Sequence, residues 1–228
     1  MQRAAFDRAE VRLLFGFGLW MTVSNLISPL LVYLDRFAIS RYGSLSDVAY
    51  YSTPFELIAR LLFVSQAVSG VMFPLLTAAI AERPAEMPRL MRQNYLLLLG
   101  LIGPVTLVVF VLAKPGLTLW LGAAFAAHSA PVLQILAVGV LLNSLASVPF
   151  STLQAMRRPD LTAKIHLIEL PLYLVLLAVL LQHFGIVGAA VAWTTRVGVD
   201  FAAIAWMEAR LRRATLPDRE VIDQARTA

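Results

Sequence analysis

Long apolar runs are the feature of this sequence that most restricts its fold. A helix needs roughly 20 mostly apolar residues to cross a bilayer, and about six stretches of the chain reach that length. Charged or helix-breaking residues separate the stretches, at residues 41–44, 82–84, 114–116, 157–160 and 183–185. The predicted spans are Leu13–Leu34, Leu57–Ala81, Tyr95–Ala113, Pro131–Met156, Ala163–Gln182 and Gly185–Met207. This pattern predicts an all-α, polytopic membrane helix bundle.

The composition supports the same class of protein. Hydrophobic residues make up 59% of the chain and charged residues only 14%, whereas about a quarter of the residues in a soluble domain are charged. A soluble core could not bury this much apolar surface, so lipid must act as the solvent. The chain has no cysteine, which excludes disulfides, thiol nucleophiles and cysteine-ligated metal sites.

Lysine and arginine alternate between the two sides of the predicted bundle, and they are retained on the cytoplasmic side of membranes. Three would face the periplasm, namely Arg36, Arg41 and Lys114. Fourteen would share the cytoplasmic side, namely Arg3, Arg8, Arg12, Arg83, Arg89, Arg92, Arg157, Arg158, Lys164, Arg210, Arg212, Arg213, Arg219 and Arg226. We therefore expect both termini in the cytoplasm, and we expect the net charge of +5 to reflect membrane topology rather than a nucleic-acid partner.

This topology divides the chain into three predicted parts. Residues 1–12 would form a cytoplasmic amphipathic segment, residues 13–208 a six-span membrane domain, and residues 209–228 a cytoplasmic basic tail. The first apolar run is too long for a signal-peptide core, so we interpret it as a retained span.

Three charged residues lie deep inside the last two predicted spans, where each costs at least about 2.5–3.5 kcal/mol to insert unless it is paired or hydrated. Glu169 is in the fifth span, and Arg196 and Asp200 lie four residues apart on one face of the sixth. They form either a neutralising clamp between two helices or a group in a water-filled cavity, which would exchange a proton or meet an anionic ligand. We expect Asp200 to pair with Arg196 and Glu169 to be the exchangeable carboxylate.

A second group of charges is expected at the periplasmic face. Asp35 and Arg36 end the first span, and Glu56 and Arg60 begin the second, so a helical hairpin would bring them together. They are either snorkelling interfacial charges or cations and acids at the mouth of a cavity.

The first span carries a semi-polar stripe. Thr22, Asn25, Pro29, Tyr33 and Arg36 recur at helical spacing. This stripe would line a cavity or hydrogen-bond to neighbouring helices.

No pattern in the sequence is typical of an enzyme. The chain lacks a phosphate-binding glycine loop, a nucleophile elbow and an HExxH motif. His166 and Glu169 are three residues apart, but two ligands do not make a metal site, and a histidine that packs between helices is the favoured interpretation. We therefore expect no catalytic residue, metal or cofactor.

Several stretches form a series in a fixed order. They are SPLLVYLDRF at 28–37, AYYSTPFE at 49–56, LWLG at 119–122 with SAPVL at 129–133, AK through ELPLY at 163–173, and GIVGAA at 185–190 through Arg196 to Asp200. This series resembles the second half of bacterial polysaccharide flippases, the Wzx-like O-antigen exporters of the MATE/MOP transporter superfamily. The resemblance covers roughly residues 8–208.

The resemblance implies a function. Family members move an anionic oligosaccharide, linked to undecaprenyl pyrophosphate, from the cytoplasmic to the periplasmic leaflet of the inner membrane during cell-surface polysaccharide biosynthesis. They are thought to use an ion gradient and a cationic central cavity. Arg36, Arg60 and Arg196 are the residues of this chain that could line it, because guanidinium matches phosphate geometry and stays charged when desolvated.

The chain departs from the family in length, because it supplies only about one of two pseudo-symmetric halves. We therefore expect it to require a missing N-terminal half or a second copy. The alternatives are a drug antiporter of the same superfamily, whose cationic cargo would favour acids in the cavity, and a non-transporting membrane remnant. A membrane glycosyltransferase is a further alternative, but it would need catalytic acids and a large extramembrane loop.

Overall fold

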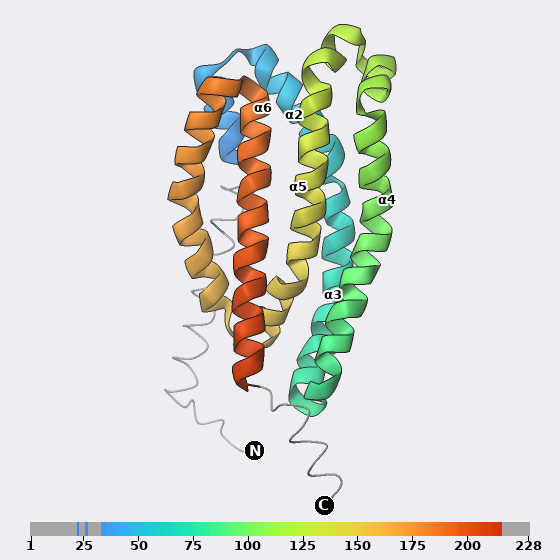
Figure 1. Ribbon diagram of the computed structural model, residues 1–228, viewed down its shortest axis with the longest axis vertical. Coiled ribbons are helices and arrows are strands. Elements are labelled where there is room, and N and C mark those ends of the chain that lie inside the picture. Colours follow the sequence, from blue (N-terminus) through green and yellow to red (C-terminus); the bar gives the residue numbers. More distant parts are fainter. Residues whose placement is uncertain (1–21, 23–25, 27–32, 216–228) are drawn as a thin grey trace, which may run out of the picture.

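The computed structural model describes Thr22, Leu26 and residues 33–215. Within these residues every regular element is helical, which confirms the predicted all-α fold. Residues 33–42 are helical. The elements that follow are α2 (Leu45–Ala59), α3 (Leu61–Glu82), the short 3₁₀-helix η1 (Pro84–Glu86), α4 (Met87–Leu121), α5 (Ala123–Ala155) and α6 (Pro159–Thr215). Long helices run side by side along the length of the bundle (Figure 1).

Four helical stretches of the described residues are long and apolar enough to cross a membrane. The fourth, α6, has 57 residues, which corresponds to about 85 Å of helix against a hydrocarbon core of about 30 Å. Gly185 interrupts it with non-helical backbone angles, φ 57° and ψ −142°, and the chain turns back there (Figure 1). The two arms of α6, residues 159–184 and 186–215, therefore correspond to the fifth and sixth predicted spans. The first predicted span lies largely outside the described residues.

The turn between the two arms depends on two glycines. A positive φ is unfavourable for residues with a Cβ atom, so glycine suits position 185. A Cβ atom on Gly188 would lie 2.0 Å from the carbonyl oxygen of Leu180. The arms can thus approach closely enough to form a tight helical hairpin.

One predicted break lies in the wrong place. Residues 114–116 were expected to separate two spans, but α4 continues through Pro115 to Leu121. The break is at Gly122, which has φ 88° and ψ 162°. Proline is tolerated inside membrane helices when neighbouring groups satisfy the freed backbone. The glycine with a positive φ, rather than the proline, therefore ends this helix.

The second predicted span begins earlier than expected. Ser44 and Asp47 form a capping box, in which the Ser44 amide donates to Asp47 Oδ2 at 2.8 Å and the Asp47 amide donates to Ser44 Oγ at 3.1 Å. This cap starts α2 at Leu45, and the helix continues to a bend at Arg60, where α3 begins. The stretch Leu45–Glu82 thus includes the predicted span and a preceding segment.

Basic residues gather at one end of the bundle, which we call the basic end. It contains the α3–α4 turn, the α5–α6 turn and the end of α6, whereas α2 and the turns at Gly122 and Gly185 lie at the opposite end (Figure 1). The described basic residues of these segments are Arg83, Arg89, Arg92, Arg157, Arg158, Lys164, Arg210, Arg212 and Arg213. In the α5–α6 turn, Arg158 donates to both oxygens of Asp160, at 2.9 and 3.1 Å, and these bonds raise the pKa of Arg158.

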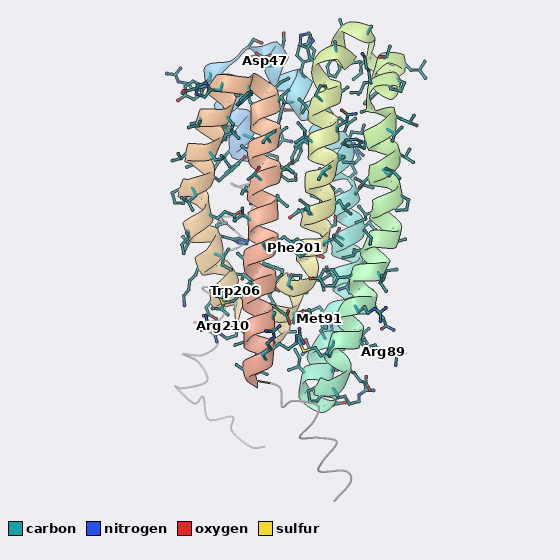
Figure 2. The ribbon with its side chains drawn as sticks, viewed as in Figure 1. Asp47, Arg89, Met91, Phe201, Trp206 and Arg210 are labelled. Atoms are coloured by element: carbon teal, nitrogen blue, oxygen red, sulfur yellow. The ribbon has the colours of Figure 1, made fainter. Side chains whose placement is uncertain are left out.

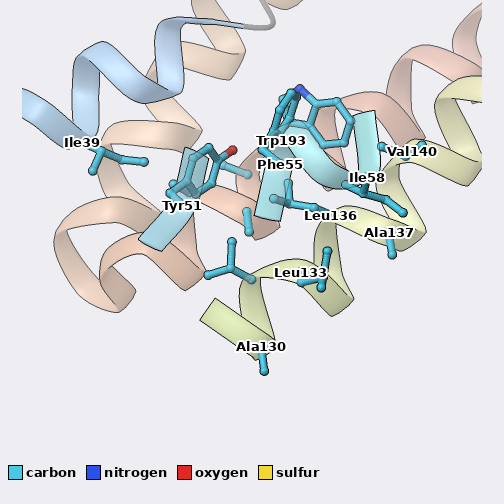
Figure 3. Close-up of a cluster of buried hydrophobic side chains, with 14 of the residues drawn as sticks. Ile39, Tyr51, Phe55, Ile58, Ala130, Leu133, Leu136, Ala137, Val140 and Trp193 are labelled. Atoms are coloured by element: carbon cyan, nitrogen blue, oxygen red, sulfur yellow. The ribbon is translucent and has the colours of Figure 1, made fainter. Parts of the chain in front are cut away.

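The main hydrophobic core lies between α2, α5 and the second arm of α6. Trp193 and Tyr51 are fully buried, and the Phe55 ring meets the Trp193 ring edge-on at 5.2 Å (Figure 3). Leu133, Leu136 and other residues of α5 pack beneath them. A smaller cluster between α3, α4 and α5 includes Leu76, Leu98 and Val148. These contacts hold α5 at the centre of the bundle.

Candidate functional site: a polar cavity with buried charges

A cavity of about 570 Å³ lies between α3, α5 and α6. It reaches towards the basic end, because Gln154 on its wall is the second-last residue of α5. The lining residues of α3 and of α5 recur every three or four residues, so each helix presents one face to the cavity. The lining residues are Leu62, Ser65, Gln66, Ser69, Gly70 and Phe73 of α3, Asn143, Ala146, Ser147, Phe150, Ser151 and Gln154 of α5, and His166, Arg196, Asp200 and Ile204 of α6. We call this hollow the polar cavity.

The polar walls were not predicted, although the sequence contains a signal for them. Ser65 and Ser69 are one helical turn apart, as are Asn143 and Ser147, within otherwise apolar spans. The hydroxyl oxygens of Ser65 and Ser69 are buried and lack a hydrogen-bond partner among the described residues. Buried polar groups usually have a partner in the protein or in ordered water. These walls are therefore suited to water or to a polar cargo.

Four titratable side chains meet at one wall of the cavity, and we call them the buried charge group. They are His166 and Glu169 from the first arm of α6, and Arg196 and Asp200 from the second. Arg196 Nη1 lies 3.7 Å from Glu169 Oε1, and His166 Nε2 lies 3.6 Å from Asp200 Oδ1. All four residues are buried, and His166, Arg196 and Asp200 line the cavity, whereas Glu169 does not.

The pairing inside this group differs from the expected one. Arg196 forms its ion pair with Glu169 across the two arms of α6, not with Asp200 on its own arm. Asp200 faces His166, which was interpreted from the sequence as a packing residue. In the sequence, the only hint of a role for His166 was its position three residues before Glu169. The structure adds Asp200 from the other arm, so that three potential ligands lie close together.

The two contacts within the group, at 3.6 and 3.7 Å, are longer than ordinary hydrogen bonds. Within the described residues, both oxygens of Glu169, Asp200 Oδ1, His166 Nδ1 and Arg196 Nε have no hydrogen-bond partner. Leaving buried polar groups unpaired is costly. The arrangement therefore has unused capacity for protons, water or a polar ligand.

The same residues could supply metal ligands. One ligand atom from each of His166, Glu169 and Asp200 lies within 4.8 Å of the others. However, the Arg196 guanidinium already occupies the Glu169 carboxylate and would repel a dication bound to it. The Arg196–Glu169 pair therefore disfavours a resident metal at this position.

A second polar group lies at the opposite end, where the hairpin was predicted to bring charges together. Arg36 Nη2 donates to Glu56 Oε1 at 2.8 Å, and the buried Asp35 carboxylate accepts from the Tyr51 hydroxyl. The Arg36 guanidinium also lies 4.6 Å from the centre of the Phe55 ring. Asp35, Arg36 and Glu56 thus meet as expected.

The other predicted site residues differ in where the structure places them. Arg60 is exposed and forms no ion pair within the described part of the chain. Thr22 is exposed, and Tyr33 is half exposed beside the Arg36 guanidinium, 4.8 Å from it. Asn25 lies outside the described residues. Of the described residues, Arg60, Thr22 and Tyr33 do not line the polar cavity, whereas Arg196 does.

Residues 2–130 match the sequence model of a family described as "Polysaccharide biosynthesis protein". This match covers more than half of the chain. The chain belongs to the polysaccharide biosynthesis protein family. No solved structure matches it.

The chain is also similar to three curated membrane proteins. It is 36% identical over 198 residues to a Shigella flexneri protein named "Putative O-antigen transporter", and 28% identical over 201 residues to "Probable low-salt glycan biosynthesis flippase Agl15" of Haloferax volcanii. It is 26% identical over 194 residues to an uncharacterized membrane protein of Methanocaldococcus jannaschii. These alignments cover 87%, 88% and 83% of the chain, respectively, but only 47%, 42% and 38% of the relatives. The chain therefore spans less than half the length of each.

Proposed function

We propose that this multi-pass membrane protein moves a lipid-linked anionic oligosaccharide across the bacterial inner membrane, as one half of a polysaccharide flippase. The observation that carries the proposal is the buried Arg196 on the wall of a polar cavity, in a member of a polysaccharide biosynthesis family. Two relatives are named as an O-antigen transporter and a glycan biosynthesis flippase.

The cavity chemistry suits both parts of such a cargo. Arginine binds phosphate oxygens through a planar fork and stays charged when water is removed. Serine, glutamine and asparagine side chains on α3 and α5 offer hydrogen bonds to sugar hydroxyls. An apolar bundle surface in contact with lipid would leave the polyprenyl chain in the bilayer while the headgroup crosses through the cavity.

The buried charge group would couple transport to an ion gradient. The cavity wall exposes the His166–Asp200 pair to the cargo path, and a proton on this pair would change the charge beside Arg196. A cargo molecule or a proton can drive a conformational cycle only if it binds the inward-facing and outward-facing states with different affinity. The rival role is a static clamp between the two arms of α6, in which the same charges only hold the helices together.

Orientation and partners complete the proposal. The basic end would face the cytoplasm. Both termini would then be cytoplasmic, and the Arg36–Glu56 pair would lie at the periplasmic mouth. The chain would contribute the C-terminal half of a flippase and require an N-terminal half or a second copy to close the cavity. Its role would be transport and not catalysis.

Flipping of a polyprenyl-diphosphate-linked oligosaccharide in proteoliposomes would test the function. The assay measures how much sugar becomes accessible to an external lectin. Arg196→Gln should reduce flipping at least tenfold, and Arg196→Lys should reduce it less because lysine keeps the charge but lacks the fork. Arg213→Gln, an exposed residue at the basic end, is the matched control. Normal flipping by a folded Arg196→Gln variant would exclude the cavity role.

The same proteoliposomes separate the alternatives. Export of a cationic dye without flipping of the oligosaccharide would identify a drug antiporter, and neither activity from wild type, with or without an N-terminal half, would identify a remnant. A pH series separates coupling from clamping. Asp200→Asn should flatten the pH dependence of flipping if the pair carries the coupled proton, whereas an unchanged profile with reduced thermal stability would indicate a clamp.

A further inference from the structure

A second hollow lies at the basic end, between the first turns of α4 and the last turns of α6. Its volume is about 290 Å³. It is lined by Pro88, Met91, Arg92, Tyr95 and Leu96 of α4 and by Arg212 of α6. Met91 on α4 and Trp206 and Arg210 on α6 mark this level of the bundle in Figure 2. We call it the basic cleft.

The basic cleft carries an excess of positive charge. Arg212 Nε donates to Glu208 Oε1 at 3.0 Å, and the Glu208 side chain is only 4% exposed, so this pair fixes the position of the Arg212 side chain. Arg92 is exposed and forms no ion pair or hydrogen bond within the described part of the chain. Two guanidinium groups from different helices thus line one hollow, and none of its lining residues is acidic. The Glu208 carboxylate is not a lining residue and is already paired with Arg212.

The residues at the level of the cleft are typical of a membrane surface, both on α4 beside it and on another face of α6. Leu96 is 56% exposed, and Leu99, one turn further along α4, is 47% exposed. Trp206 is 59% exposed, and the Arg210 guanidinium lies 5.4 Å above its ring. Tryptophan and tyrosine concentrate at the headgroup level of bilayers, and arginine reaches from there to the water. The cleft therefore opens at headgroup depth, beside an apolar surface that acyl chains can cover.

We propose that the basic cleft binds the headgroup of an anionic phospholipid from the leaflet at the basic end. The lipid phosphate would lie between Arg92 and Arg212, the Tyr95 hydroxyl would donate to it or to the glycerol oxygens, and an acyl chain would follow Leu96 and Leu99. Basic hollows between membrane helices are suited to such headgroups. The bound lipid would connect the start of α4 to the end of α6. This inference does not depend on the transport function.

Native mass spectrometry of the full chain, purified in detergent, would test the site with phosphatidylglycerol and with phosphatidylcholine of the same acyl chains. Wild type should retain phosphatidylglycerol preferentially. Arg92→Gln should weaken that binding about fivefold, the factor that corresponds to about 1 kcal/mol per basic residue near a lipid surface. Arg92→Lys should retain part of it. Arg89→Gln, an exposed arginine of the same turn outside the cleft, should bind like wild type.

Each other outcome would overturn the inference. Equal retention of both lipids would show that charge plays no part. Equal losses in Arg89→Gln and Arg92→Gln would indicate diffuse attraction to the whole basic end. Saturation by inorganic phosphate at the same concentration would indicate a free-anion site, and selective retention of polyprenyl diphosphate over phosphatidylglycerol would assign the cleft to the cargo.

Discussion

At the scale of single residues, the buried charge group contains two pairs that link the arms of α6. Arg196 lies 3.7 Å from Glu169 and over the rings of Tyr173 and Trp193, at 5.6 and 6.0 Å. Asp200 belongs to the other pair, with His166. Glu169 is therefore the carboxylate that offsets the cost of burying the guanidinium. This assignment exchanges the roles expected for Glu169 and Asp200 from the sequence.

The exchange leads to a stability prediction. Glu169→Gln should lower the thermal stability of the protein in detergent more than Asp200→Asn does, because it leaves Arg196 without its partner. Removing one partner of a buried pair typically costs about 3–5 kcal/mol. The measurement is the melting temperature of the two purified variants. A greater loss for Asp200→Asn would show that Arg196 depends on the carboxylate of its own arm.

At the scale of elements, α5 is the helix on which the others pack. It contacts α2, α3, α4 and α6, and it packs tightly against α6 at Gly139. A Cβ atom there would lie 2.5 Å from Trp193 Cζ3 and 2.7 Å from Thr194 Oγ1. Small residues let membrane helices approach closely, since packing rather than the hydrophobic effect joins them in lipid. Gly139 therefore sets the distance between α5 and the arm that carries Arg196.

Gly139→Ala should destabilise the protein by about 1–3 kcal/mol, as overpacking of a tight contact does. Gly100→Ala is the matched control, because a Cβ atom on Gly100 meets nothing within 4 Å. Thermal unfolding in detergent would measure both. The double variant Gly139→Ala, Trp193→Phe tests the cause. If the smaller ring recovers none of the loss, the contact with Trp193 is not its source.

At the scale of the whole molecule, the helices alternate in direction, so the turns lie at two ends that differ in charge. The basic end has nine described lysines and arginines, and the opposite end has Arg36, Arg41 and Lys114. Such asymmetry orients membrane proteins because basic loops are retained in the cytoplasm. It also places the polar cavity and the basic cleft towards the same side of the membrane.

Cysteine labelling would measure this orientation, because the chain has no cysteine of its own. In intact cells, Ser46→Cys and Ala127→Cys should react with a membrane-impermeant maleimide, whereas Ala85→Cys and Arg213→Cys should react only after the cells are lysed. All four positions are exposed in the structure. A reversed result at a single position would contradict the proposed topology.

The sequence by itself determined the class of fold, the alternation of helices and the location of most turns. These features depend on local properties, namely apolar length, charge between spans, and residues such as Ser44 and Gly185 that start a helix or permit a turn. The error at 114–116 has a local cause too, because a proline and a glycine in sequence predict a break that lipid and neighbouring helices can override. Gly122 was the residue whose backbone conformation ended the helix.

Only the tertiary structure decided which side chains meet. Helical spacing places Asp200 on the same face as Arg196, but the rotation of the two arms about Gly185 determines that Arg196 faces Glu169 and Asp200 faces His166. The polar cavity likewise forms only because Ser69 of α3 and Asn143 of α5 line the same hollow. Neither pair of polar residues predicts a cavity from its own helix alone. Pairing across helices depends on their packing distance and rotation, and residues far apart in the chain, such as Gly139 and Trp193, set both.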